Sequence, residues 1–135
     1  MTTPAAPSLI PAGHLDLLER PLIGHLATVS PNGRPQSNPM WFAWIGDQLR
    51  FTHTNTRRKY AQLQTNPYVA FSVVDPDQPA RYLELRGRVG EIIADPTGAF
   101  YASLSQRYGR AGEPPADAPT RVILVVDAHH VTSMG

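Results

Sequence analysis

Hydrophobic and polar positions alternate along much of the chain, which is typical of half-buried β-strands. The clearest examples are residues 68–74 (YVAFSVV) and 82–93 (YLELRGRVGEII). Further strands are predicted at 22–29, 36–44, 48–53 and 121–126, with an extension over 131–134 beyond a kink at 127–130. Because Asn32-Gly33 and Gly46-Asp47 mark tight reversals, we expect the strands at 22–29, 36–44 and 48–53 to form an antiparallel meander.

Three short helices are predicted between these strands. Residues 15–20 (LDLLER) are amphipathic and end at Pro21. A second helix runs from Arg57 to about Gln64, with Asn55 or Thr56 placed to cap its first turn. A third runs from Pro96 to about Tyr108 with Asp95 as its N-cap, and a surface loop rich in glycine and proline follows at 109–119.

The order of these elements indicates the architecture. Six or seven strands with three short helices, and no strand-helix-strand alternation, favour a closed or nearly closed antiparallel barrel. A chain of 135 residues is long enough to bury one hydrophobic core. We therefore predict a single domain over residues 14–135, preceded by a frayed segment at 1–13.

The composition excludes several kinds of functional site from this barrel. The absence of cysteine excludes disulfides, thiolate metal sites and cysteine nucleophiles. The five histidines lack chelating spacing, so no metal site is predicted, and His25 and His53 are candidates to line a shared pocket. The serines have no nucleophile-elbow context and the carboxylates are scattered, so no catalytic residue is assigned.

The N-terminal sequence MTTPAAPSLIPAG has no basic start and no apolar stretch of signal-peptide length. Apolar runs elsewhere are too short to span a membrane. We therefore expect a cytoplasmic protein that has no membrane partner.

The net charge is only +1, but the charges are unevenly placed. Residues 20–74 hold six cations and one acid, and three of the cations are consecutive: Arg57, Arg58 and Lys59. Cations at the start of a helix oppose the helix dipole unless an anion binds there. Together with the free backbone N–H groups of the first turn they favour a phosphate group, whereas the alternative is a solvated charged face.

The aromatic residues Trp41, Phe42 and Trp44 suggest that the anion bound at that site also has a flat ring system. A barrel with an anion site and no catalytic group of its own most economically uses a flat, anionic redox cofactor. Core and dimer packing are the alternative role for the aromatic residues. Binding of single-stranded nucleic acid is disfavoured, because the near-neutral charge lacks the long basic track that such binding needs.

Three segments carry a family resemblance: LIGHLATVSPNGRPQSNPMWFAW, LRFTHTNTRRKYAQLQTNPYVAFSVV and RYLELRGRVGEI. They resemble the split β-barrel superfamily of flavin and deazaflavin oxidoreductases, and most closely its pyridoxamine-phosphate-oxidase-like, F420-dependent branch of actinobacterial type. The resemblance implies a mainly β fold, a six- to seven-stranded antiparallel split β-barrel of the FMN-binding type. It also implies a homodimer that holds the cofactor in a groove at the subunit interface.

The same resemblance assigns a cofactor site by position. The residues implied to hold or flank the phosphate are Arg57, Arg58, Lys59, Thr52 and Thr54. Those implied to lie along the tricyclic ring are Ser37, Asn38, Pro39 and Met40. Trp41 and Tyr82 are implied neighbours of the cofactor across the dimer interface.

The implied activity is hydride transfer between coenzyme F420 and a small conjugated organic substrate. The alternatives are an FMN-dependent reductase or oxidase of the same fold, and a cofactor-binding protein without turnover. True pyridoxamine phosphate oxidases carry cations on the second strand, where residues 36–41 of this chain have none. That specific oxidase activity is therefore not expected.

Overall fold

The computed structural model describes residues 9–135, so the first eight positions of the predicted frayed segment 1–13 lie outside the described residues. Within the remainder of that segment, Ile10 is buried in the hydrophobic core. A 3-10 turn, η1 (Ala12–His14), follows it. Because Ile10 buries its apolar side chain, core packing reaches further toward the N-terminus than the predicted domain start at residue 14.

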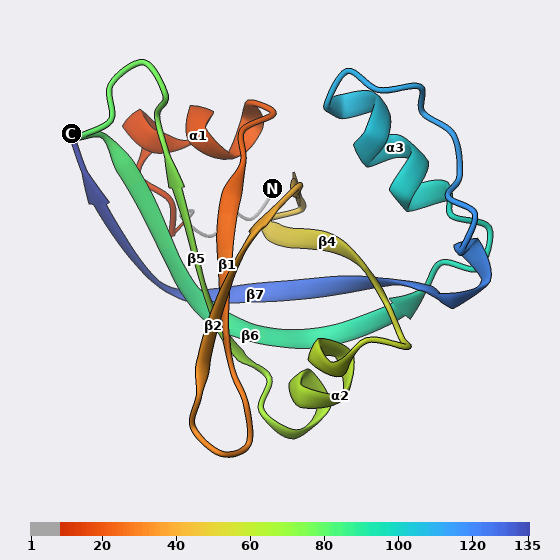
Figure 1. Cartoon of the computed structure of the whole chain (residues 1–135). Coiled ribbons are helices and arrows are strands. Elements are labelled where there is room, and N and C mark those ends of the chain that lie inside the picture. The colour runs from red at the N-terminus through yellow and green to blue at the C-terminus, as the bar shows by residue number, and fades with distance from the viewer. Residues whose placement is uncertain (1–8) are drawn as a thin grey trace, which may run out of the picture.

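Seven strands and three α-helices follow one another along the described chain (Figure 1). The strands are β1 (Gly24–Val29), β2 (Pro35–Met40), β3 (Ala43–Ile45), β4 (Gln48–Thr54), β5 (Tyr68–Val74), β6 (Tyr82–Ala94) and β7 (Arg121–Met134). The helices are α1 (Asp16–Glu19), α2 (Arg58–Thr65) and α3 (Ala99–Arg107), with a second 3-10 turn, η2 (Ala118–Thr120). The predicted mainly β fold is confirmed.

All seven strands join one antiparallel sheet in the order β2-β1-β5-β6-β7-β4-β3. The predicted meander is wrong. β1 pairs with β2 and β3 pairs with β4, but β2 and β3 lie at opposite edges of the sheet. Consecutive strands are therefore split between the two ends of the sheet.

The predicted strand at 36–44 is interrupted at Trp41 and Phe42, which belong to neither β2 nor β3. The Phe42 N–H donates to the Tyr108 hydroxyl at 3.0 Å, and the Phe42 carbonyl accepts from Arg107 Nε at 3.0 Å. The Trp41 indole stacks on the Tyr108 ring with 5.1 Å between centroids. These contacts with the end of α3 replace strand pairing at Trp41 and Phe42. The chain therefore leaves the sheet after β2 and joins it again as β3 at the opposite edge.

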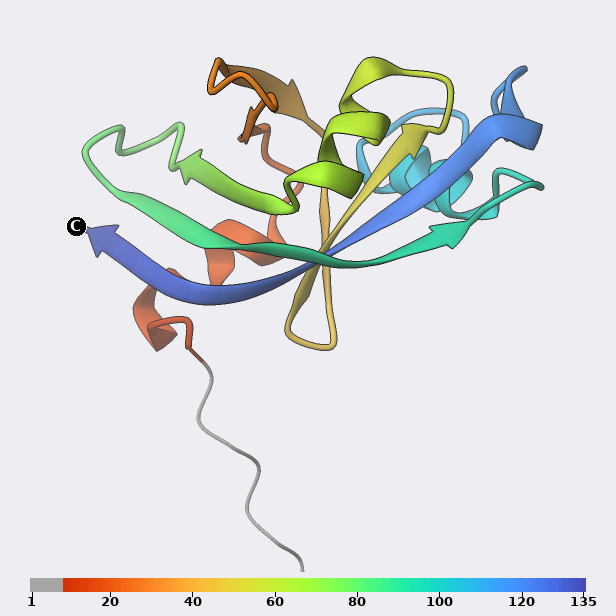
Figure 2. The same cartoon turned by 90° about the horizontal axis from the view of Figure 1, so that it is seen from below.

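β6 and β7 are paired along most of their length and run across the whole molecule (Figures 1 and 2). Their register shifts between Arg86 and Gly87, where β7 bulges within the kink predicted at 127–130. β7 continues past this kink to Met134, as expected. Gly87 is required there, since a Cβ atom would overlap the backbone carbonyl of Asp127.

The core contains three phenylalanine rings in edge-to-face contact. The Phe71 ring lies 4.9 Å from that of Phe42 and 5.5 Å from that of Phe51, measured between centroids. A Cβ atom at Gly24 would overlap the Phe71 ring, so the glycine lets β1 pass close to this cluster. Burying each such ring contributes about 2–3 kcal/mol to folding, which holds the curved sheet in one shape.

The third helix begins later than predicted. α3 starts at Ala99, and its N-cap is Gly98 with φ of 70° rather than Asp95. The Asp95 carboxylate still accepts the backbone N–H groups of Phe100 at 3.2 Å and Tyr101 at 3.3 Å. Asp95 thus satisfies donors of the first turn from outside the helix.

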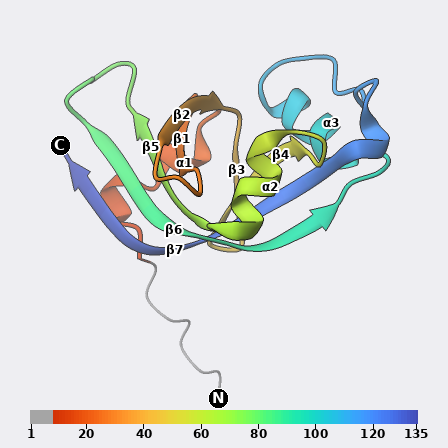
Figure 3. The ribbon, with the colours of Figure 1, turned by 60° about the horizontal axis from the view of Figure 1, so that its bottom comes forward.

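The helices lie at different ends of the sheet. α1 and α3 are at one end and α2 is at the other, beside the turn of the β1–β2 hairpin (Figures 1 and 3). Within residues 9–135 no helix has the length and apolar character that crossing a membrane requires. Several cationic side chains gather at the end that carries α2.

Candidate anion-binding site

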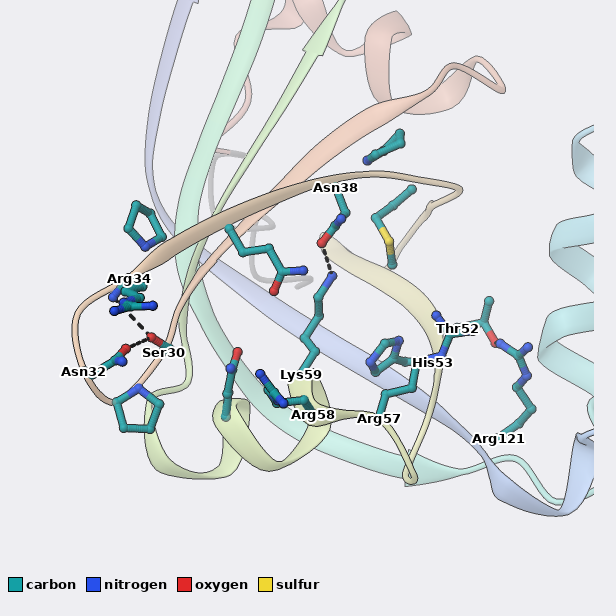
Figure 4. A pocket seen from close by; sticks show the side chains of 16 residues that line it. Ser30, Asn32, Arg34, Asn38, Thr52, His53, Arg57, Arg58, Lys59 and Arg121 are labelled. Atoms are coloured by element: carbon teal, nitrogen blue, oxygen red, sulfur yellow. Dashed lines mark hydrogen bonds between the residues drawn. The ribbon is translucent and has the colours of Figure 1, made fainter.

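A cavity of about 1150 Å³ opens between the β1–β2 hairpin, β4, the start of α2 and the start of β7 (Figure 4). Among the described residues, its lining includes five cationic side chains and no carboxylate. The cations are Arg34, Arg57, Arg58, Lys59 and Arg121. Cations gathered in a concave site create a positive potential, so the cavity favours an anion.

The start of α2 adds to this potential, because no side chain caps it. The N-cap is Arg57, and no side-chain hydrogen bond satisfies the first turn. The prediction that Asn55 or Thr56 caps this helix is therefore wrong. The Thr56 hydroxyl instead donates to the Thr54 hydroxyl at 3.4 Å. The free N–H groups and the positive end of the helix dipole remain available to an anion.

Lys59 is buried, with 8% of its surface exposed. Its Nζ donates to Oδ1 of Asn38 on β2 at 2.8 Å (Figure 4). Burial, and to a lesser degree the Arg57 guanidinium, lower the pKa of the Lys59 ammonium. A buried cation beside a carboxamide and another cation lacks the opposite charge that normally accompanies it. A bound anion would supply that charge.

His53 lies on β4 with 7% of its surface exposed, and its Nε2 has no hydrogen-bond partner. Burial lowers the pKa of its imidazole to about 4, assisted by the positive charges of Lys59, Arg57 and Arg121. The imidazole is therefore neutral at pH 7. His53 was absent from the positional prediction of the site, because a lone histidine in a strand carries no distinctive sequence signal.

The hypothesis that His25 and His53 share a pocket is wrong. His25 lines a separate hollow of about 640 Å³ on the outer face of the sheet, together with Tyr82 and Glu84. His53 lines the cationic cavity.

Arg121, at the start of β7, reaches the cavity from the opposite side. Its Nη1 donates to the Thr52 hydroxyl at 3.4 Å, and its Nε donates to Asp117 at 2.9 Å. Its guanidinium lies 4.8 Å from the centroid of the Tyr101 ring. The sequence offered no signal for Arg121, since only the pairing of β4 with β7 brings it beside Thr52.

The cavity brings together seven of the eleven residues that were predicted for the site: Asn38, Pro39, Met40, Thr52, Arg57, Arg58 and Lys59. The other four do not line it. Ser37 lies on β2, Thr54 is buried at the end of β4, Trp41 stacks on Tyr108, and Tyr82 lines the outer hollow. The binding roles of all eleven stay predictions.

Comparison with known proteins identifies the family. The family model described as pyridoxamine 5'-phosphate oxidase matches residues 10–135. Curated pyridoxine/pyridoxamine 5'-phosphate oxidases of Legionella pneumophila, strains Lens and Paris, are 33% identical over 79 residues. That match covers 58% of this chain and 36% of the length of each curated relative.

Solved structures agree with this family. A protein described as an F420 reductase is 58% identical, with a TM-score of 0.88 over 91% of this chain and 98% of its own. A conserved hypothetical protein from Mycobacterium tuberculosis shares the fold at 23% identity, with a TM-score of 0.74 over 98% of this chain and 89% of its own. The described sheet and the matched family model together show that the chain belongs to the pyridoxamine 5'-phosphate oxidase family, a group of split β-barrel, flavin-type oxidoreductases.

Proposed function

We propose that the chain is an F420-dependent oxidoreductase that transfers a hydride between the deazaflavin cofactor and a small conjugated organic substrate. The observation that carries this proposal is the 58% identity to an F420 reductase over 91% of this chain. The family as a whole supports a flavin-type cofactor. The cationic side chains that line the cavity support a cofactor that carries a phosphate group.

The residues of the cavity fit such a cofactor. Arg57, Arg58 and Lys59 would hold its phosphate, because guanidinium and ammonium groups donate charge-assisted hydrogen bonds to phosphoryl oxygens. The buried Lys59 ammonium and the unpartnered Nε2 of His53 are groups that a bound phosphate would satisfy. Asn38, Pro39 and Met40 on β2 would lie along the ring system, offering main-chain polar groups and apolar contact.

The chemistry that F420 supplies when bound is hydride transfer between its C5 atom and an electrophilic carbon of the substrate. The chain would contribute binding, orientation and partial exclusion of water rather than a covalent nucleophile. Since no carboxylic acid lines the described cavity, His53 is neutral at pH 7 and Lys59 would hold the phosphate, solvent would supply any proton that the substrate takes up.

We further propose that the chain forms a homodimer through the outer face of β1, β5, β6 and β7. Val74, Tyr82 and Met134 lie side by side across three strands of this face. The exposed apolar residues of the same strands are Val29, Tyr68, Val74 and Met134. An exposed group of apolar side chains on one sheet face is typical of an interaction surface.

A titration tests the cofactor assignment. The full chain is purified from a host that lacks F420, its visible spectrum is recorded, and F420 and FMN are titrated against it by fluorescence. We expect colourless protein that binds F420 at micromolar concentration or below and binds FMN much more weakly. Tighter binding of FMN, or a yellow preparation, would move the assignment to an FMN-dependent enzyme.

Two further outcomes bear on catalysis. Binding of neither cofactor contradicts the proposal. Where F420 binds, the reduced cofactor is mixed with quinones and conjugated enones, and its oxidation is followed by absorbance. Tight binding without oxidation across these substrate classes would indicate a cofactor-binding protein without turnover.

A further inference from the structure

Among the described side chains that line the cavity, only that of His53 is buried and has a polar atom without a hydrogen-bond partner. Its Nε2 makes no hydrogen bond, although 93% of the residue's surface is covered by protein. A buried polar atom without a partner is unfavourable, and native proteins nearly always satisfy it. The unpartnered nitrogen is therefore a feature that a ligand of the cavity would explain.

The surroundings of His53 restrict what that ligand group is. Lys59 and Arg57 face the imidazole from the side of α2, and Arg121 faces it from β7. The described cavity lining holds no carboxylate. Three positive neighbours disfavour a further cation as the missing partner, and burial together with these charges holds the imidazole in its neutral form. A neutral imidazole can still donate one hydrogen bond from a protonated ring nitrogen.

We propose that His53 is a ligand-binding residue whose Nε2–H donates a hydrogen bond to a phosphoryl oxygen of the group held by Arg57 and Lys59. This inference rests on the proposed function, because it takes the cavity as the site of the cofactor phosphate. His53 would differ from its cationic neighbours in being a neutral donor in a fixed position on β4. The protein around the imidazole fixes that position, although Nε2 has no hydrogen-bond partner.

Substitutions at His53 test the proposal. In His53→Gln the amide nitrogen can stand near the position of Nε2, whereas His53→Phe keeps a planar ring and removes the donor. We expect His53→Phe to weaken binding of F420, or of FMN if that is the cofactor, about tenfold or more. His53→Gln should stay within about threefold of the wild-type affinity. Ile45→Phe, at an exposed position on β3 outside the cavity and outside the proposed dimer interface, is the control for introducing a ring.

The outcomes separate this inference from the proposed function. A wild-type chain that binds neither cofactor nor inorganic phosphate contradicts the proposed function itself. Wild-type binding with an unchanged affinity in folded His53→Phe contradicts only the role of His53. If His53→Gln loses as much affinity as His53→Phe, a donor near the position of Nε2 does not account for the binding and the proposal is overturned.

A measurement on the unaltered protein covers the case in which His53→Phe does not fold. The full chain is labelled with ¹⁵N in its histidine rings, and the ring N–H signals are recorded with and without saturating ligand. We expect a ring N–H signal of His53, protected from exchange with water, to appear on addition of the cofactor, and of inorganic phosphate. Ring signals of His53 that do not change at saturation would overturn the proposal.

Discussion

Lys59 and Arg57 place two cations on one wall of the cavity, the first buried and the second exposed. Replacing both with alanine should weaken cofactor binding by about 1.5–3 kcal/mol for each charge-assisted contact that is lost. The larger share is expected from Lys59, since solvent screens the exposed Arg57. Fluorescence titration of Lys59→Ala, Arg57→Ala and the double variant measures the two contributions.

In the absence of cofactor, replacing Lys59 should not lower the stability of the fold. Lys59→Ala removes a buried cation that has no carboxylate beside it, so we expect the free energy of unfolding to stay level or increase. Arg110→Ala, an exposed arginine outside the cavity, is the matched control and should change neither affinity nor stability. An unchanged cofactor affinity in the double variant would contradict the proposal that Arg57 and Lys59 hold the phosphate.

His53 makes stability depend on pH in a defined window. Its pKa is about 4 in the folded chain, against 6.5 for an ordinary histidine. Between these values the unfolded chain binds a proton that the folded chain does not bind. The free energy of unfolding should therefore fall by about 3 kcal/mol as the pH drops from 6.5 to 4. Urea unfolding at half-unit pH intervals measures this slope.

Two comparisons isolate the contribution of His53. His53→Gln carries no titrating ring and should lose the slope in that window. Asp16 and Asp75 also titrate, but hydrogen bonds from Arg81 and from the Asp77 backbone, respectively, lower their pKa below 3.8, so their effect begins at more acidic pH. A slope between pH 6.5 and 4 that survives in His53→Gln would contradict the assignment to His53.

At the scale of elements, Arg107 joins α3 to the end of α1. Its guanidinium donates to the backbone carbonyls of Leu18, Glu19 and Arg20 at 2.9–3.0 Å, and to that of Phe42 at 3.0 Å. The carbonyls of Leu18, Glu19 and Arg20 lie at the C-terminal end of α1, where a helix leaves its last carbonyls without intrahelical partners. Arg107 satisfies them and also fixes the turn that separates β2 from β3.

Arg107→Ala should therefore destabilise the fold strongly. Charge-assisted hydrogen bonds contribute about 1.5–3 kcal/mol each, and because these four share one side chain we expect a total loss of about 3–4 kcal/mol. Chemical denaturation measures the loss, with Arg110→Ala as the control at the next arginine along the chain. A loss below about 1 kcal/mol would show that α1 and α3 are held mainly by other contacts.

Local patterns predicted the elements well where neighbouring residues decide the structure. Alternation identified β5 and β6, and Pro21 ended the first helix close to where α1 ends. The division of the strand at Trp41 was not predictable, because its cause is Tyr108, far away in the sequence. For the same reason, consecutive cations revealed one wall of the cavity, whereas Arg121 becomes visible only once β4 and β7 are paired.

At the scale of the whole molecule, the split order of strands creates the cavity. β2 and β4 lie on opposite sides of the sheet order, yet both supply lining residues, and α2 lies between them (Figure 3). The cavity is wide and open on the described chain, so a second subunit that covers its mouth would restrict water there. Dimer formation and cofactor binding should then be coupled.

This coupling gives a prediction about assembly. We expect light scattering at micromolar concentration to report a dimer of about 30 kDa, twice the 14.8 kDa of the chain. Val74 is 43% exposed on the outer face, and Val74→Glu would place a charge in the proposed interface. That variant should be monomeric and should bind the cofactor more weakly than the wild type.

Ile45→Glu is the matched control, since Ile45 is 48% exposed on β3, an edge strand outside the proposed interface. It adds the same charge at a similar exposed apolar position, so it should stay dimeric and keep its cofactor affinity. A monomeric wild type would contradict the homodimer itself. A dimeric Val74→Glu with undiminished affinity would instead place the interface on another face, since a two-fold interface would bury one unpartnered glutamate from each subunit.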